Sequence, residues 1–178
     1  MALLQRKNLL ITGLPGVGKT TLIRQLAEAL EPFRPAGFYT REIRKGGERM
    51  GFEIVSLDGR QGLLSHVDIR SSFRVGKYGV DVDGFESFLE ALPFLGPAIR
   101  LIIVDEIGKM ECLSERFRRL LGEVLDSEKL VIATVALKGT GFIEQVKVRK
   151  DVKIFELSAK NRNRLFTEVL EEVTVGLR

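Results

Sequence analysis

The sequence is poor in the residues that build disulfides and transition-metal sites. Cys112 is the only cysteine, which excludes an internal disulfide and a cysteine-ligated metal cluster. His66 is the only histidine, which excludes a zinc site made of several histidines. No apolar run approaches the roughly 20 residues that a membrane-spanning helix needs. The first ten residues, MALLQRKNLL, lack the long apolar core and small-residue cleavage site of a signal peptide, so we expect a cytoplasmic protein with no membrane partner.

The remaining composition is ordinary for a globular protein. With 44% hydrophobic and 29% charged residues, the 178-residue chain is expected to form a single domain over residues 1–178 and to act as a monomer. Its formal net charge of +4 suits a protein that holds polyphosphates, and it also suits nucleic-acid binding. Because the basic residues are not interleaved with aromatic ones, nucleic acid is not the favoured partner. Cys112 is better explained as a small buried apolar side chain than as a nucleophile.

A phosphate-binding loop is predicted at residues 13–20, GLPGVGKT. This stretch has the pattern of a glycine, four free positions and Gly-Lys-Thr or Gly-Lys-Ser. The apolar run at 9–11 predicts a strand before it, and the spacing of Leu22, Leu26 and Leu30 predicts a helix after it. Strand, loop and helix in this order are the structural context that the motif requires.

The residue types of this loop suit a triphosphate. Backbone N–H groups at the start of a helix attract anions, and glycine lets the backbone come close to phosphate. Lys19 can place its ammonium between the terminal phosphates, and the Thr20 hydroxyl can ligate a magnesium ion that bridges them. Pro15 has no N–H to donate, so it stiffens the loop. The glycines that supply the close approach are Gly13, Gly16 and Gly18.

A β-rich insert is predicted after this first strand-helix unit. EPFRP, at 31–35, ends the helical pattern. Strands are predicted at 36–43, 50–57 and 61–67, with a tight turn at Asp58-Gly59. The segment FRVGKYGVDVDGFE, at 73–86, is predicted to be a loop near the site.

The second half of the chain alternates strands and helices. Continuous apolar runs at 101–104 and 130–135 are typical of strands covered on both faces, and a last strand is predicted at 152–157. Helices are predicted at about 84–92, after the N-cap Ser114, around 142–148, and after the N-cap Ser158. The alternation predicts an α/β fold whose mostly parallel central sheet lies between helical layers and binds ligands beyond the carboxyl ends of its strands.

Two adjacent carboxylates, Asp105 and Glu106, follow the apolar run at 101–104. The carboxyl end of a buried strand is where the magnesium-associated carboxylate of a phosphate-loop enzyme belongs, so Asp105 is predicted to serve the metal. Glu106 can polarise a water molecule for attack on the terminal phosphate. This pairing favours water-activating enzymes over most nucleotide kinases.

Five segments carry a family resemblance: GLPGVGKTTL at 13–22, GFYTREIRKGGERMGF at 37–52, VGKYGVDV at 75–82, DEIGKME at 105–111 and NRN at 161–163. In this order they resemble the thermophilic-type nucleoside-triphosphatase family, whose animal relative is called cancer-related nucleoside-triphosphatase. The resemblance implies a three-layer, RecA-like phosphate-loop fold. It also implies slow hydrolysis of ATP, GTP, CTP and UTP to diphosphate and phosphate, with Mg²⁺ as cofactor and weak base selectivity.

Carried over by position, the resemblance implies metal binding by Thr20 and Asp105 and catalysis by Lys19 and Glu106. Nucleotide binding falls to the phosphate loop and to the strand that carries the carboxylates, namely Gly13, Leu14, Pro15, Gly16, Val17, Gly18, Lys19, Thr20, Thr21, Leu101, Ile102, Ile103, Val104, Asp105, Glu106, Ile107 and Gly108. Further candidate phosphate or substrate contacts are Arg44, Arg49, Lys77, Tyr78, Lys109, Glu111 and Arg162. Glu42 also matches the family pattern, whereas Arg41 and Asn163 depart from it, so base recognition is not predicted.

Several assignments stay open at this point. Arg44, Arg49 or Arg162 could stabilise the charge of the transition state, although a structural ion pair is the favoured reading of each. Tyr78 could stack on a base, but a buried tyrosine with a satisfied hydroxyl is the simpler alternative.

Two other functions also remain. One is a phosphotransferase acting on a nucleotide, an RNA end or a metabolite, with a second pocket lined by Arg44, Arg49 and Lys77. The other is a nucleotide-switched binding module whose β-rich insert contacts a protein or RNA.

Overall fold

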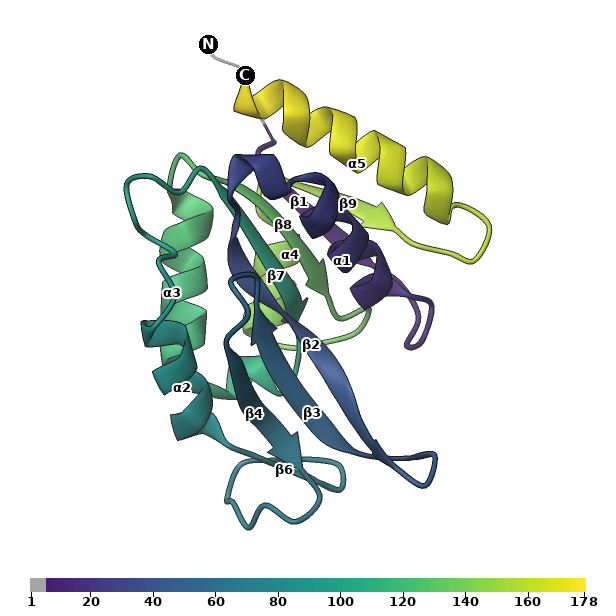
Figure 1. Cartoon of the computed structure of the whole chain (residues 1–178), viewed down its shortest axis with the longest axis vertical. Helices are drawn as coiled ribbons and strands as arrows, with labels where there is room; N and C mark the ends of the chain where they lie inside the picture. Colours follow the sequence, from purple (N-terminus) through teal and green to yellow (C-terminus); the bar gives the residue numbers. More distant parts are fainter. Residues whose placement is uncertain (1–5) are drawn as a thin grey trace.

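A mixed sheet of nine strands crosses the computed structural model, which describes residues 6–178 (Figure 1). The spatial order is β5-β6-β4-β3-β2-β7-β8-β1-β9. The strands are β1 Asn8–Thr12, β2 Ala36–Lys45, β3 Glu48–Ser56, β4 Gln61–His66, β5 Arg74–Val75, β6 Tyr78–Val80, β7 Leu101–Ile107, β8 Leu130–Val135 and β9 Val152–Glu156. Strands β2, β7, β8, β1 and β9 are parallel, and the insert strands continue the same sheet in antiparallel pairing.

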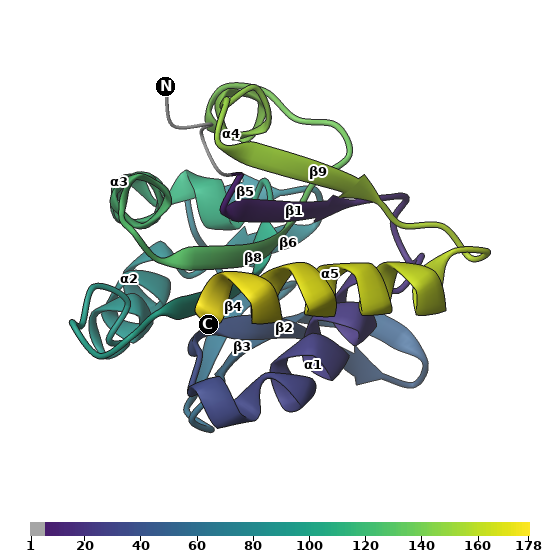
Figure 2. The ribbon, with the colours of Figure 1, turned by 90° about the horizontal axis from the view of Figure 1, so that it is seen from above.

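Helices cover both faces of the parallel part of the sheet (Figure 2). One face carries α1 and α5, and the other carries α2, α3 and α4. Their bounds are α1 Lys19–Ala29, α2 Val82–Glu90, α3 Glu115–Asp126, α4 Phe142–Lys147 and α5 Arg162–Leu177, with 3₁₀ turns η1 Glu31–Phe33 and η2 Glu111–Leu113. The predicted three-layer α/β fold is therefore confirmed, as is the β-rich insert after α1.

Two hydrophobic clusters hold the layers together, one on each face of the sheet. Successive residues of β7 alternate between them: Leu101 and Ile103 pack toward α1 and α5, and Ile102 and Val104 pack toward α2, α3 and α4. All four side chains are at most 1% exposed. This explains the continuous apolar run, because a strand between two helical layers has no solvent-facing side.

The parallel pairing brings the functional segments to one edge of the sheet. β8 pairs with both β1 and β7, so the ends of these three strands lie next to one another. The phosphate loop follows β1, and Asp105 and Glu106 lie in the last residues of β7, which runs on to Ile107. Parallel strands present their carboxyl ends on the same side, and this is where such sheets bind ligands.

The structure corrects three predictions of where elements lie. The predicted loop at 73–86 contains the short β5–β6 hairpin and the start of α2. That helix begins at Val82, not near Gly84, because the Asp81 carboxylate accepts the Gly84 N–H and caps it. The predicted cap Ser158 is also wrong: α5 begins at Arg162, and Asn161 Oδ1 accepts the Ser158 N–H, 2.8 Å away.

Ser114 does cap its helix, since its hydroxyl oxygen accepts the Phe117 N–H at 2.9 Å. Within residues 6–178, no helix combines the length and the apolar character that crossing a bilayer requires. Residues 1–5, which belong to the stretch in which we predict no signal peptide, lie outside the described residues.

Candidate active site

The segment at 13–18 turns the chain from β1 into α1 and leaves the start of the helix open. Gly18 occupies the N-cap position with φ of 103°, and no side chain caps the helix. The first turn of α1 also holds no acidic residue. Its N–H groups and the positive end of the helix dipole are therefore available to an anion. Gly16, with φ of 75°, gives the loop a second backbone conformation that larger side chains rarely adopt.

Lys19 lies across this loop. Its Nζ donates to the Gly13 carbonyl at 3.2 Å and lies 4.0 Å from Glu106 Oε2. Its side chain is 12% exposed, so the ammonium faces the loop and the carboxylate more than bulk water. The charge is thus fixed between the phosphate loop and the end of β7.

Asp105 is held by three threonines from three elements. Its Oδ2 accepts from the Thr20 hydroxyl at 2.7 Å, at the start of α1. The same oxygen accepts from Thr40 of β2, through its hydroxyl at 3.1 Å and its N–H at 3.3 Å. Oδ1 accepts from the Thr134 hydroxyl at 2.6 Å, on β8. Because the carboxylate is only 1% exposed, these bonds replace the water it loses.

Glu106 and Glu111 are two further carboxyl groups beside the loop. Burial raises the pKa of Glu106, the Asp105 charge raises it further, and Lys19 opposes both effects. Glu111 is 4% exposed, and burial together with the Glu106 charge raises its pKa well above 4.5. A Cβ added at Gly108 would lie 2.8 Å from an oxygen of each, so both carboxyl groups flank this glycine.

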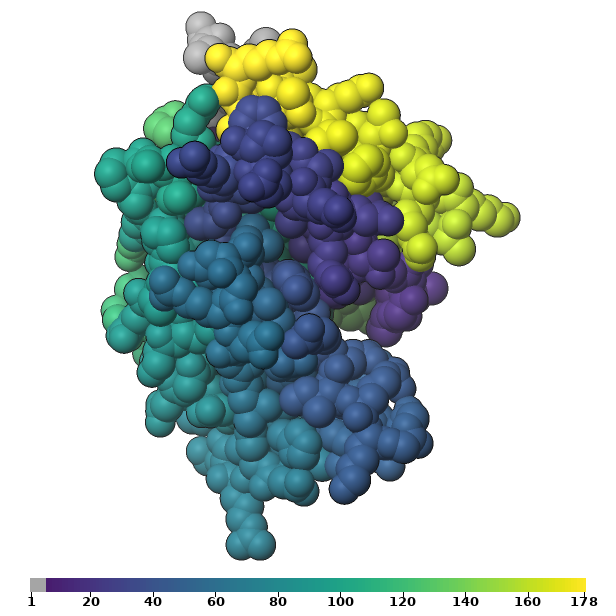
Figure 3. Space-filling model, in the orientation of Figure 1, coloured from purple at the N-terminus to yellow at the C-terminus, as the bar shows by residue number. Residues whose placement is uncertain are grey.

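These groups open into one cavity of about 830 Å³. Figure 3 shows the hollow between the phosphate loop, in purple, and the β2–β3 hairpin, in blue. Predicted site residues that line it are Gly13, Leu14, Pro15, Gly16, Gly18, Lys19, Thr20, Thr21, Arg49, Asp105, Glu106, Lys109 and Glu111. The cavity therefore unites the two segments that the sequence singled out.

Other predicted residues lie elsewhere. Leu101, Ile102, Ile103, Val104 and Ile107 were expected to bind nucleotide through their strand, but their side chains are buried in the hydrophobic clusters. Val17 and Gly108 are also not among the residues that line the cavity. The apolar residues of β7 thus hold Asp105 and Glu106 in position, and they do not line the cavity themselves.

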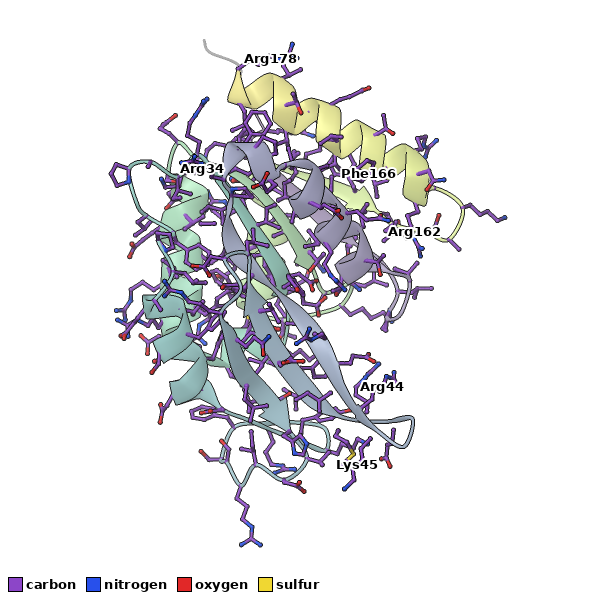
Figure 4. All side chains as sticks on the ribbon, in the orientation of Figure 1. Arg34, Arg44, Lys45, Arg162, Phe166 and Arg178 are labelled. Atoms are coloured by element: carbon purple, nitrogen blue, oxygen red, sulfur yellow. The ribbon has the colours of Figure 1, made fainter. Side chains whose placement is uncertain are left out.

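The three candidate arginines have three different environments. Arg44 and Arg49 both form ion pairs with Glu42, as the favoured reading predicts, but only Arg49 lines the cavity. Arg162 donates to the Val17 carbonyl at 2.7 Å and lies against Gly18. Figure 4 shows Arg162 beside the N-terminal end of α1 and Arg44 on the projecting β2–β3 hairpin. Arg162 therefore supports the phosphate loop from α5.

Lys77 and Tyr78 do not line the cavity. Lys77 pairs with Glu48 at 2.7 Å, and its ammonium lies 5.6 Å from the centre of the Tyr78 ring. The Tyr78 ring packs edge-on against Phe52, at 5.7 Å between centroids. Tyr78 is half-buried and its hydroxyl donates to the Arg49 carbonyl at 3.5 Å, so the simpler alternative, a buried tyrosine with a satisfied hydroxyl, is met only in part. Cys112 is also no nucleophile here, because burial raises the pKa of its thiol to about 12.

The sequence interpretation missed several residues at the site. Thr40 and Thr134 bind Asp105 but have no predicted role, and only the pairing of β2 and β8 with β7 places them there. The other lining residues without a predicted role are Arg24, Arg41, Glu42, Phe52, Leu64, Val75, Met110, Ala136, Leu137 and Lys138. Most of them come from the insert and from the loop after β8.

Known proteins resemble this chain in both sequence and structure. The family model described as NTPase matches residues 8–170. Nucleoside-triphosphatase THEP1 of Thermotoga maritima is 50% identical over 163 residues, covering 91% of this chain and 92% of the relative. The crystal structure of THEP1 from Aquifex aeolicus has a TM-score of 0.79 at 31% identity, covering 93% of this chain and 98% of that one.

A second solved structure is similar to the same extent. The solution structure of a human cancer-related nucleoside triphosphatase has a TM-score of 0.80 at 38% identity. The match covers 94% of this chain and 97% of the human one. Both sequence and structure comparisons thus extend over nearly the whole chain.

Proposed function

The chain belongs to the NTPase family, and from that premise we propose that it is a nucleoside-triphosphatase. The proposed substrates are ATP, GTP, CTP and UTP, which are hydrolysed to the diphosphate and inorganic phosphate. One observation carries the proposal: Lys19, Asp105 and Glu106 converge on the same cavity as the open start of α1. A triphosphate needs such an arrangement of cations and N–H donors, and its hydrolysis needs a group that can direct water.

The oxygen groups at the loop suit Mg²⁺. Among residues 6–178 no cluster of three or more His, Cys, Asp or Glu side chains could hold a metal by itself. Magnesium usually binds one or two protein oxygens and completes its shell with water and substrate phosphates. Thr20 and Asp105, whose oxygens are 2.7 Å apart, would hold it here. When bound, Mg²⁺ supplies positive charge that neutralises the phosphate oxygens.

The protein's own residues divide the remaining work. The loop N–H groups and Lys19 bind the β- and γ-phosphates, and Thr40 and Thr134 keep Asp105 oriented. Glu106 accepts a proton from the attacking water, and its raised pKa brings it closer to neutral pH, where a general base is most effective. Since these contacts reach phosphate and not base, weak base selectivity is expected.

Slow turnover is also part of the proposal. Fast phosphoryl transfer usually needs an arginine at the transition state. Arg41 and Arg49, the two insert arginines that line the cavity, are each held on the insert by an ion pair, with Glu53 and Glu42, so neither is expected to move onto the terminal phosphate. We also propose that the enzyme is a monomer in the cytoplasm. Sedimentation of the purified protein would check the oligomeric state.

The test is release of inorganic phosphate from each of the four triphosphates with Mg²⁺. Wild type is expected to act on all four, and Glu106→Gln and Lys19→Ala are each expected to lose at least 100-fold in kcat. Lys45→Ala, on the tip of the β2–β3 hairpin, is the control and should keep wild-type activity. A Glu106→Gln protein as active as wild type would contradict the proposed role of this carboxylate.

A further inference from the structure

The cavity extends well beyond the place of the terminal phosphate. One end is formed by the phosphate loop, and the other by the insert, through Arg41, Arg49, Phe52, Leu64 and Val75. Asp105 and Glu106 lie between the two ends. The volume of about 830 Å³ belongs to the two ends together. The insert end is thus a part of the cavity that neither the phosphate loop nor the two carboxylates form.

The orientation of the bound triphosphate indicates that the attacking group lies at the insert end of the cavity. Lys19 of the motif reaches the β- and γ-phosphates, so the terminal phosphate lies beside Lys19 and Glu106. The nucleoside leaves the loop from the α-phosphate, on the far side. In phosphoryl transfer the attacking and leaving oxygens are roughly in line. The insert end consequently faces the terminal phosphate on the side opposite to the leaving diphosphate.

The walls of the insert end combine cations with an apolar floor. Phe52, Leu64, Val75 and Met110 supply apolar surface. Arg49 lies with its guanidinium 5.3 Å from the centre of the Phe52 ring. A flat apolar body next to a guanidinium suits a ring-containing molecule that also carries negative charge.

The cations have capacity left for an anion. Arg49 pairs with Glu42 through a terminal nitrogen, and 42% of its side chain remains exposed. Arg41 keeps its side chain 47% exposed while it pairs with Glu53, and Lys109 is exposed at the rim. An anion can therefore approach exposed parts of all three cations.

We propose that the insert end is a binding site for a second ligand, a nucleoside monophosphate, which accepts the terminal phosphoryl group. Arg49, Arg41 and Lys109 hold its phosphate, and the half-buried side chains of Phe52, Val75 and Met110 hold its base. This inference rests on the proposed function, because the acceptor is placed against the terminal phosphate of the same bound triphosphate.

The transfer balances without a proton. An anionic phosphate oxygen of the monophosphate forms a bond to the γ-phosphorus, and the bond from that phosphorus to the β–γ bridging oxygen breaks. One triphosphate and one monophosphate become two diphosphates. Since no water has to be deprotonated, Glu106 is required for hydrolysis but not for this transfer.

The test supplies γ-labelled ATP, Mg²⁺ and AMP, CMP, GMP or UMP, and separates the products. The expected result is labelled diphosphate of the added monophosphate. Glu106→Gln should keep this transfer while it loses phosphate release. Arg49→Gln should raise the KM for the monophosphate at least tenfold. Arg44→Gln is the matched control, because Arg44 also pairs with Glu42 but does not line the cavity. Lys19→Ala, purified in the same way, reports any contaminating kinase.

The outcomes separate the two proposals. Phosphate release without any labelled diphosphate would leave the hydrolase in place and overturn the acceptor site. Labelled diphosphate without phosphate release would support the acceptor site and overturn the proposed hydrolase. Monophosphates that only compete with ATP would show that the cavity holds one nucleotide, and this too would overturn the acceptor site. If Arg49→Gln left the KM for the monophosphate unchanged, the position assigned to the acceptor's phosphate would be wrong.

Discussion

The three carboxyl groups beside the phosphate loop differ in how their charge is compensated. Asp105 accepts hydrogen bonds from three threonines, and Glu106 faces Lys19. Glu111 is buried, and no basic side chain of residues 6–178 forms an ion pair with it. Because a buried carboxylate without a cation is unfavourable, Glu111 retains its proton to a higher pH than an exposed glutamate does.

Glu111→Gln is expected to change how stability depends on pH. In wild type the folded state keeps the Glu111 proton that the unfolded chain releases above about pH 4.5. The free energy of unfolding therefore falls as pH rises toward the raised pKa, by up to about 1.4 kcal/mol per pH unit. Glutamine cannot ionise, so the variant lacks this loss. Urea unfolding at several pH values between 5 and 8 would measure the difference.

The control for this prediction is Glu115→Gln. Glu115 lies at the start of α3 and is 76% exposed, so its replacement should leave the pH profile of wild type unchanged. If Glu111→Gln and wild type lost stability in parallel as pH rises, Glu111 would not be protonated in the folded state.

At the scale of elements, helix starts are decided by which side chain reaches the free N–H groups. Ser114 is fully buried, accepts the Phe117 N–H and donates its own hydroxyl to Glu86 at 2.6 Å. It therefore joins α3 to α2 as well as capping α3. Ser158 occupies a similar place in the sequence before α5 but is exposed and caps nothing.

Ser114→Ala is expected to lower the free energy of unfolding by about 1–2 kcal/mol, because it removes the cap and leaves Glu86 without its donor. Ser158→Ala should stay within about 0.5 kcal/mol of wild type. Urea unfolding of both variants gives the comparison. Equal losses would mean that the cap at Ser114 contributes nothing specific.

The element predictions failed where the local pattern was shortest. The strands β5 and β6 have 2 and 3 residues, too few for a period to appear in the sequence. The prediction for Ser158 was wrong because the chain forms a turn between the end of β9 at Glu156 and the start of α5 at Arg162. This turn places Asn161, and not Ser158, at the N-cap position. Longer elements, such as the strand at 101–104, were predicted because both helical layers impose a continuous apolar run.

At the scale of the whole molecule, a nucleotide in the cavity would contact the loop after β1, the start of α1 and the end of β7. These segments are far apart in the unfolded chain, so the ligand binds only the folded state. Mg²⁺-ADP at 100 times its Kd should therefore raise the free energy of unfolding by about 2.7 kcal/mol.

Thermal unfolding with and without Mg²⁺-ADP measures this stabilisation. Lys19→Ala should lose most of it, and chelation of Mg²⁺ should reduce it in wild type. Lys45→Ala, outside the cavity, is the control that should keep it. A shift that is equal in Lys19→Ala and wild type would place the nucleotide elsewhere.

The features of this protein that depend on neighbours along the chain could be predicted from residue types and their spacing. The phosphate loop, the helix after it and the pair Asp105-Glu106 are local patterns whose chemistry follows from residue type and spacing. The alternation of strands and helices likewise predicted the layers, since each segment carries its own periodicity. Even the resemblance to a family rests on segments read in order.

Which strands are neighbours in the sheet follows from the folded arrangement and not from local sequence. β8 and β2 flank β7, and this order brings Thr134 and Thr40 to Asp105 although they are distant in sequence. It also sets Arg49 at the cavity and leaves Arg44 and Lys77 outside it. Strand order depends on the total packing of both helical layers, and no local pattern encodes it.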